Sequence, residues 1–99
     1  MYSLMRIWLL TAEIHLRVGN LDGAEQCANE ARSWSPICYH LTYVRGLIFE
    51  ARGQFEDARQ CYENTLSVNP THLSSLYHLG RVYYQLGFYR LSEQTLKVS

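Results

Sequence analysis

Histidine and cysteine are the residues of this chain that could ligate a metal ion, and their spacing does not favour a site. His72 and His78 are six positions apart, so they do not share one helical face at the spacing of two ligands. Cys38 and His40 flank Tyr39, but no second pair of ligands accompanies them. We therefore expect neither a metal ion nor another cofactor.

The motifs of common catalytic sites are also missing. The sequence contains no GxSxG, no HExxH and no phosphate-binding glycine loop. Cys61 could act as a nucleophile only beside a histidine base, and the helical pattern described below places Cys61 away from the inward face. The cysteines, Cys27, Cys38 and Cys61, are odd in number and form no CxxC pair, which favours reduced thiols in a cytosolic protein. We expect a protein without enzymatic activity.

The charge balance excludes two classes of partner. Lys plus Arg and Asp plus Glu number 9 each, whereas nucleic-acid binders and membrane-surface proteins normally carry a basic excess. The longest uncharged, mostly apolar run, residues 7–12, is far shorter than a membrane span. We expect no nucleic-acid binding and no direct membrane insertion. A group of tyrosines could stack on bases, but without a basic groove their packing in the core or a groove is the better interpretation: Tyr77, Tyr83, Tyr84 and Tyr89.

The side chains discussed above belong to an internal repeat of 34 residues. Gly19, Gly53 and Gly87 are 34 residues apart, as are Pro36 and Pro70. Self-similarity at a fixed period of this length indicates a stack of similar structural units. The same step relates three further sets: Ala12, Gly46 and Gly80; Ala24, Ala58 and Ser92; and Gln26, Gln60 and Gln94.

Each unit has the pattern of two amphipathic helices. In the middle unit, which is best formed between Tyr43 and Pro70, apolar residues recur at helical intervals over about 38–51 and 55–67. Gly53 lies between these segments, where a glycine ends a helix at little cost by adopting the left-handed conformation. The other helices are expected at about 4–18, 21–33, 73–86 and 88–98.

Small residues and helix caps complete the pattern. Gly46 lies within a helix, where it costs about 1 kcal/mol relative to alanine, so its recurrence indicates a close approach of the second helix, with Ala58 facing it. Asn20 and Thr71 precede two of the expected helices and are candidate N-caps.

Residues in matching repeat positions give the chain a resemblance to the tetratricopeptide repeat family. The resemblance covers almost the whole chain and implies an all-α, right-handed α-solenoid of about three helix–turn–helix repeats with six antiparallel helices. It implies a single array over 1–99, with repeats at 5–38, 39–72 and 73–99, the third incomplete. His15, Ala28 and Thr42 depart from the pattern, which usually has aromatic or large residues there. The matching residues are Trp8, Ala24, Pro36, Gly46, Phe49, Ala58, Tyr62, Pro70, Gly80 and Tyr83.

Three segments resemble a narrower group, the C-terminal repeats of the tetratricopeptide repeat protein seven family. They are YVRGLIFEARGQFEDARQCYE from Tyr43, VNPTH from Val68, and QLGFYRLSEQTL from Gln85. That resemblance implies a scaffold of the plasma-membrane phosphatidylinositol 4-kinase complex. The implied partners are the kinase and its companion scaffold subunits. The implied location is the cytoplasm, with recruitment to the plasma membrane through partners.

A stacked array presents an inward surface made by the first helix of each unit. The residues in that phase mix aromatic, apolar and charged side chains, which suits a segment of a protein partner. Some of the apolar members could instead pack against neighbouring helices. The expected partner-binding residues are Arg6, Leu9, Glu13, His40, Tyr43, Leu47, Glu50, Tyr77, Arg81 and Tyr84, with Leu16 and Ser74 on the same face.

One known mode of tetratricopeptide binding is not expected here. Chaperone-binding members resemble one another in a basic, asparagine-rich clamp for a C-terminal carboxylate. This chain has other residue types at the corresponding positions, which argues against the binding of chaperone tails: Leu9, Glu13, Val44, Ser74 and His78.

An alternative function is that the repeats are a structural spacer or a self-association module within a longer scaffold. A free-standing array normally ends in a helix with a polar outer face, whereas the final segment here carries Phe88, Leu91, Leu96 and Val98. The first segment is similarly apolar, with Leu4, Met5, Ile7 and Trp8. The pattern predicts a fragment of a longer solenoid, or self-association through an exposed end.

Overall fold

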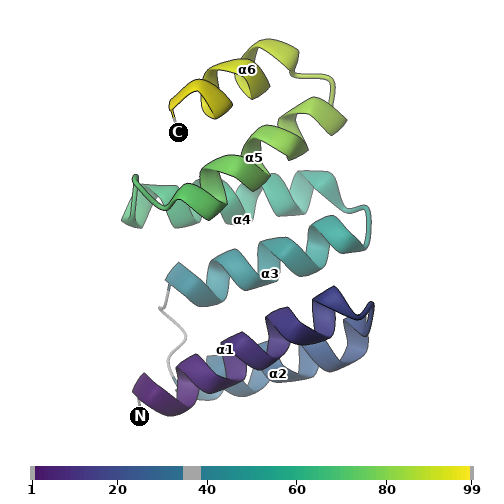
Figure 1. The fold of residues 1–99 in the computed structure, drawn as a ribbon, viewed down its shortest axis with the longest axis vertical. Helices are drawn as coiled ribbons and strands as arrows, with labels where there is room; N and C mark the ends of the chain where they lie inside the picture. The colour runs from purple at the N-terminus through teal and green to yellow at the C-terminus, as the bar shows by residue number, and fades with distance from the viewer. Residues whose placement is uncertain (1, 35–38, 99) are drawn as a thin grey trace.

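The computed structural model describes residues 2–34 and 39–98, with side chains described for 6–33 and 39–97. These residues form six helices, stacked along the longest axis of the molecule (Figure 1), and the described part contains no strand. The all-α solenoid expected from the repeat is confirmed. The expected positions Pro36 and Cys38 lie outside the described residues, as do the side chains of Leu4, Met5 and Val98. The helices are α1 (Tyr2–Arg17), α2 (Leu21–Trp34), α3 (Tyr39–Ala51), α4 (Phe55–Val68), α5 (Leu73–Gln85) and α6 (Tyr89–Val98).

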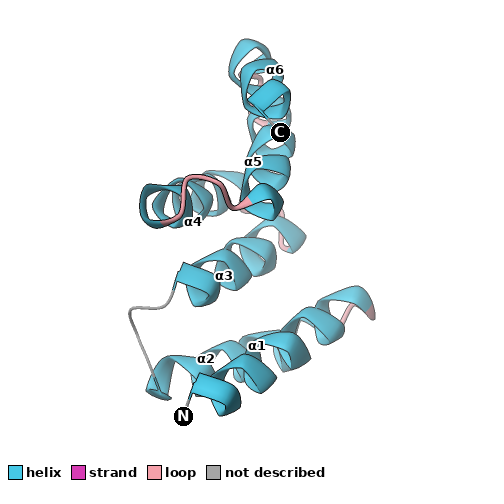
Figure 2. Ribbon diagram, turned by 60° about the vertical axis from the view of Figure 1, so that its left-hand side comes forward, coloured by secondary structure: helices cyan, strands magenta, loops and turns pink. Residues whose placement is uncertain are grey.

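The three hairpins close with the same turn. Gly19, Gly53 and Gly87 all have positive φ, between 78 and 88°, the left-handed conformation that glycine adopts without strain. The residue after each glycine donates its backbone N–H to a carbonyl five residues earlier, over 2.8 to 2.9 Å, as from Gln54 to Phe49. This bond satisfies a carbonyl that the end of the helix would otherwise leave unpaired. The short turns, drawn pink in Figure 2, therefore fold each helix pair back antiparallel.

The two predicted N-caps have different outcomes. Asn20 caps α2 as expected, because its Oδ1 accepts a hydrogen bond from the Gly23 N–H at 3.0 Å. The prediction that Thr71 caps α5 is wrong. His72 is the capping residue, and its Nδ1 accepts from the Ser75 N–H at 3.3 Å. The Thr71 hydroxyl instead bonds to the side chain of Asn69.

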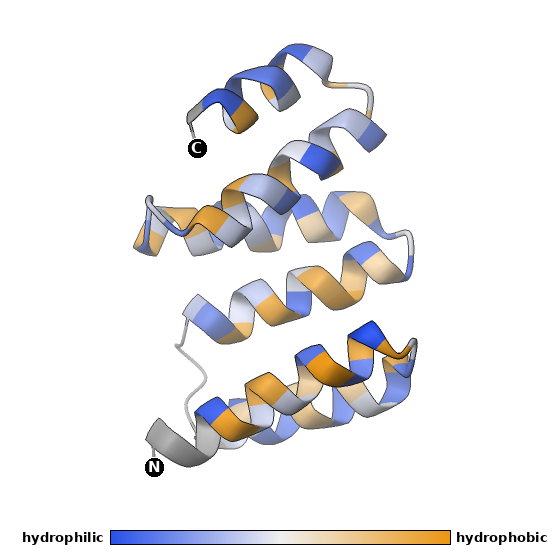
Figure 3. Ribbon diagram, viewed as in Figure 1, coloured by the Kyte–Doolittle hydropathy of each residue, from blue (hydrophilic) through white to orange (hydrophobic). Residues whose placement is uncertain are grey.

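Each hairpin packs one helix directly on its partner, and the first helices α1, α3 and α5 contact one another in turn. In Figure 1, α2 and α4 lie behind this series. Hydrophobic and hydrophilic residues alternate along every helix (Figure 3), so each helix has an apolar side for the core.

Glycine permits the close packing within the hairpins. A Cβ atom on Gly46 would lie 2.7 Å from Cε1 of Tyr62, and one on Gly80 would lie 2.6 Å from the side chain of Leu96. Gly46 therefore allows the close approach of the second helix, as expected, but the residue nearest to it is Tyr62 rather than Ala58. In the third hairpin the Ser92 hydroxyl donates to the Gly80 carbonyl at 2.7 Å.

Candidate functional site

A groove of about 410 Å³ runs across the three first helices. The helical phase explains its position, because residues three, four and seven apart on α1 and α3 share a face. We call it the first-helix groove, defined by Glu13, Leu16 and Arg17 of α1, Tyr43, Leu47, Glu50 and Ala51 of α3, and His78 and Arg81 of α5.

Glu50 is the most connected charge in the first-helix groove. Its Oε1 accepts a hydrogen bond from the Tyr62 hydroxyl at 2.8 Å and lies 3.2 Å from Nδ1 of His78. Nε of Arg81 lies 3.9 Å from its Oε2. Burial acts to raise the pKa of Glu50, but hydrogen bonds from His78 and Tyr62 and the charges of His78 and Arg81 hold the pKa below its ordinary value. Glu50 is therefore a carboxylate at neutral pH.

A second histidine–carboxylate pair repeats this arrangement one hairpin earlier. Oε2 of Glu13 on α1 lies 3.3 Å from Nε2 of His40 on α3. Glu50 on α3 is likewise paired with a histidine of the next first helix, through Nδ1 of His78 on α5. Each carboxylate thus contacts a histidine on the next first helix, and the two pairs join the three first helices along the groove.

The floor of the groove is aromatic. The Tyr43 ring lies edge-on to His72, with centroids 4.9 Å apart, and tilted to Tyr62 and His78 at 6.1 and 6.0 Å. Burial raises the pKa of Tyr43, with smaller contributions from Glu13 and Glu50 against a hydrogen bond with Ser74 that lowers the pKa. Tyr43 is therefore a neutral, packed residue that forms the base of the groove.

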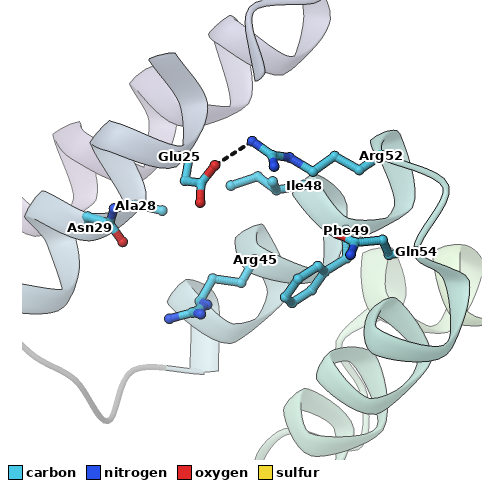
Figure 4. A pocket seen from close by; sticks show the side chains of 8 residues that line it. All are labelled: Glu25, Ala28, Asn29, Arg45, Ile48, Phe49, Arg52 and Gln54. Atoms are coloured by element: carbon cyan, nitrogen blue, oxygen red, sulfur yellow. Dashed lines mark hydrogen bonds and ion pairs between the residues drawn. The ribbon is translucent and has the colours of Figure 1, made fainter. Parts of the chain in front are cut away.

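The outer side of the array has smaller and more polar hollows. One of about 60 Å³ lies between α2 and α3 (Figure 4), where Arg52 forms an ion pair with Glu25. Arg52 also lies 3.8 Å from Asp22, so this cluster joins the first two hairpins. Cys61 and Arg45 both line a neighbouring hollow. Burial raises the pKa of the Cys61 thiol, so the thiol is protonated at neutral pH.

Comparison with known proteins assigns the repeat. Residues 46–87 match the family model described as TPR repeat. The chain is built from tetratricopeptide repeats. A crystal structure of a tetratricopeptide repeat protein from Parabacteroides merdae superposes with a TM-score of 0.75 and 27% identity, over 94% of this chain and 36% of that one.

Curated relatives confirm the narrower resemblance. Over 95 residues, 96% of this chain, the sequence is 38% identical to tetratricopeptide repeat protein 7B of Homo sapiens and 40% identical to that of Mus musculus. It is 33% identical to tetratricopeptide repeat protein 7A of Homo sapiens over the same share. The chain spans 11% of the length of each of these relatives.

The first-helix groove of this tetratricopeptide array brings together half of the expected partner-binding residues. Glu13, Tyr43, Leu47, Glu50 and Arg81 line it. His40 lies beside it through its pair with Glu13.

Leu9 does not belong to the groove. It is 1% exposed and part of the hydrophobic core, so the expectation that Leu9 contacts a partner is wrong. Tyr43 is buried as well and reaches the groove only as its floor. Arg6 and Tyr77 are exposed but outside the groove lining, and Tyr84 lines a separate hollow with Leu96.

Sequence reasoning missed three residues of the groove, namely Arg17, Ala51 and His78. His78 is 34 residues after Val44, a core position, so the repeat phase assigns it to packing. A histidine at a position that the repeat assigns to the core needs a polar partner, and this was the signal that could have identified His78. Glu50 supplies that partner. Arg17 and Ala51 lie in the last turn of α1 and α3. At a helix end, the helical periodicity does not distinguish residues at the rim of the groove from residues that face solvent.

Proposed function

We propose that this chain is a non-enzymatic scaffold module that binds a segment of a partner protein in the first-helix groove. The observation that carries the proposal is a groove continuous over all three first helices, with apolar Leu16 and Leu47 between charged side chains. Tetratricopeptide arrays use such extended surfaces to bind other proteins.

The charges of the groove define the partner segment. Glu13 and Glu50 already contact histidines, so their negative charge is partly satisfied within the chain. Arg17 lines the groove, is exposed, and has no ion pair among the residues whose side chains are described. A segment with apolar side chains against Leu16 and Leu47, and an acidic group at Arg17, fits this pattern.

The resemblance to the tetratricopeptide repeat protein 7 relatives supports a finer proposal. In that proposal the partners are a phosphatidylinositol 4-kinase and its companion scaffold subunits, and the complex brings a cytoplasmic protein to the plasma membrane through those partners. None of the described helices is long and apolar enough to cross a membrane.

Affinity capture tests the finer proposal. The protein that contains residues 1–99 is used as bait, with and without this segment. Loss of the kinase subunit or of a companion scaffold subunit on removal of the segment is the expected result. Retention of every partner would assign binding to another part of the protein.

A titration of variants tests the groove itself. Arg17→Gln and Leu47→Ala are each expected to weaken binding of the captured partner several-fold, because one removes a charge contact and the other apolar area. Arg90→Gln is the matched control, because Arg90 is an exposed arginine on α6, away from the groove. Equal affinities for all variants would contradict the groove assignment.

A second candidate is that the repeats are a spacer, or associate with one another, within a longer scaffold. The observation that favours it is a set of large apolar side chains at both ends of the stack, which are exposed in the described structure: Ile7, Leu10 and Ile14 on α1, Tyr77 and Tyr84 on α5, and Leu91 and Leu96 on α6.

A further inference from the structure

The junction between the first two hairpins carries arginines where the next junction carries leucines. The counterpart of Arg45 on α3, one repeat later, is Leu79 on α5, which is 4% exposed and part of the core. Arg32 on α2 likewise corresponds to Leu66 on α4, which packs against that core. Arginine therefore stands at two positions where the following repeat has a packed leucine, and the packing of the hairpins does not account for it.

A hollow of about 370 Å³ lies at this junction, between α2, α3 and α4. We call it the outer hollow, and the residues that matter for its chemistry are Arg32, Arg45, Phe49, Asp57 and Cys61. It adjoins the smaller hollow of Figure 4, because Arg45 and Phe49 line both. Its volume falls in the range of clefts that hold ligands, about 300–1,000 Å³. Both hairpins line it, so it lies within the array and not at one of its ends.

Arg45 is a partly buried cation without a carboxylate partner. Within the part of the chain whose side chains are described, neither Arg45 nor Arg32 forms an ion pair. The neighbouring Arg52 is paired with Glu25, and in Figure 4 the side chain of Arg45 extends apart from that pair. A carboxylate suits such a guanidinium, because its two oxygens match the planar N–H groups and compensate for the loss of water.

The rest of the lining completes the recognition surface. Phe49 lies one helical turn after Arg45 on α3 and offers a partly buried aromatic face beside the charge. Asp57 lies in the first turn of α4, where the positive end of the helix favours a carboxylate. The two arginines outnumber this aspartate in the lining, so the hollow attracts a negatively charged group.

We propose that the outer hollow binds an acidic segment of a partner protein. A glutamate or aspartate side chain of the segment pairs with Arg45 and is attracted by Arg32, while a neighbouring apolar side chain packs on Phe49. Charge complementarity selects this occupant. The outer hollow and the first-helix groove share no described lining residue, so this interaction is independent of the function proposed for the groove.

A peptide titration tests the charge requirement. The probe is a fluorescein-labelled peptide in which glutamate and leucine alternate, and the matched control is its glutamine–leucine analogue. Fluorescence anisotropy measures binding to the protein that contains residues 1–99. The glutamate peptide should bind more tightly by roughly fivefold or more, and added salt should reduce the difference. Equal affinities of the two peptides, or no binding of either, would overturn the proposal.

Variants assign the binding to the outer hollow. Arg45→Leu introduces the residue of the next repeat, so the variant should fold, which helical circular dichroism checks. It should weaken binding of the glutamate peptide by roughly fivefold or more and leave the analogue unaffected. Arg45→Lys should restore part of the binding, because lysine keeps the charge without the planar fork. The controls Arg90→Gln and Arg17→Gln should bind as wild type. Unchanged affinity in Arg45→Leu, or a loss in the groove variant Arg17→Gln instead, would overturn the proposal.

Cys61 reports directly on whether the hollow is occupied, because it lines the same space. The glutamate peptide should slow alkylation of Cys61 by N-ethylmaleimide in the wild-type protein and not in Arg45→Leu, as followed by mass spectrometry of the fragment that contains Cys61. Protection of Cys61 without any peptide, released in Arg45→Leu, would show that another segment of the same protein fills the hollow, and would overturn the assignment to a partner.

Discussion

The hydroxyl of Tyr62 donates a hydrogen bond to Glu50 over 2.8 Å, from a ring that is buried beneath the groove. The same ring occupies the space beside Gly46 and stacks on His78 with centroids 5.8 Å apart. One side chain on a second helix thus links the packing of its own hairpin to the charges of two first helices. The geometry of the groove depends on the core beneath it.

The Tyr62→Phe variant isolates that hydrogen bond. The ring and its contacts remain, but Glu50 loses one donor while His78 and Arg81 stay in place. A hydrogen bond to a charged group contributes about 1.5–3 kcal/mol, so a loss of about this size in the free energy of unfolding is expected. Urea unfolding measures it. A change below about 0.5 kcal/mol would show that water replaces the phenol hydroxyl without cost.

Stability should fall in acid partly because of Glu50. Its pKa lies below the ordinary value of 4.5 in the folded chain, so the unfolded state binds the proton more tightly. The stabilisation is therefore present above about pH 4.5 and is lost as the pH falls through the lower, folded-state pKa. We expect the stability difference between wild type and Glu50→Gln to shrink over that window in urea unfolding at several pH values.

A control for the acid effect is Tyr62→Phe, which removes one of the hydrogen bonds that lower the pKa of Glu50. The variant should lose less stability than wild type over the same window. An unchanged pH dependence in both variants would assign the acid sensitivity to other groups.

The ends of the helices could be predicted from the sequence because turn glycines and the periodic spacing of apolar residues are local signals. The segment 55–67 was expected where α4 runs from Phe55 to Val68, and 73–86 where α5 runs from Leu73 to Gln85. The cap at His72 was not accessible in this way, since histidine is not among the preferred N-cap residues. Its role depends on how the ring lies against Tyr39 and Tyr43 in the folded chain.

The site was harder to predict because exposure depends on the neighbouring hairpin. Leu9, Tyr43 and Tyr77 share one repeat position, so the helical phase assigns all three to the inward face. In the structure, Leu9 and Tyr43 are buried, with His72 and His78 packed on the Tyr43 ring, while Tyr77 is exposed. A pattern within one helix contains no information about what covers that helix.

The two helical glycines should differ in their response to alanine. In Gly46→Ala the new Cβ meets the fully buried Tyr62 ring, which has no room to move, so overpacking of about 1–3 kcal/mol outweighs the gain in helix propensity of about 1 kcal/mol. In Gly80→Ala the neighbour is Leu96, a half-exposed side chain on α6 that can change rotamer. We expect a lower melting temperature for Gly46→Ala and a smaller change for Gly80→Ala.

The turn residue Gln54 gives a reference for these measurements. It is exposed and its side chain makes no capping hydrogen bond, so Gln54→Ala should change stability by less than about 0.5 kcal/mol. Ala58→Leu should cost about 1–3 kcal/mol, because Ala58 is fully buried. Similar melting temperatures for Ala58→Leu and Gln54→Ala would show that the α3–α4 packing is looser than the structure indicates.

His72 combines a cap with a ring contact, and two substitutions separate these roles. His72→Asn keeps a side-chain acceptor for the Ser75 N–H but removes the edge-on contacts with Tyr39 and Tyr43. His72→Ala removes both, and the loss of a cap costs about 1 kcal/mol. Thermal unfolding should therefore rank wild type above His72→Asn, and His72→Ala lowest. Equal stability of the two variants would mean that the ring contacts, and not the cap, hold the start of α5 against α3.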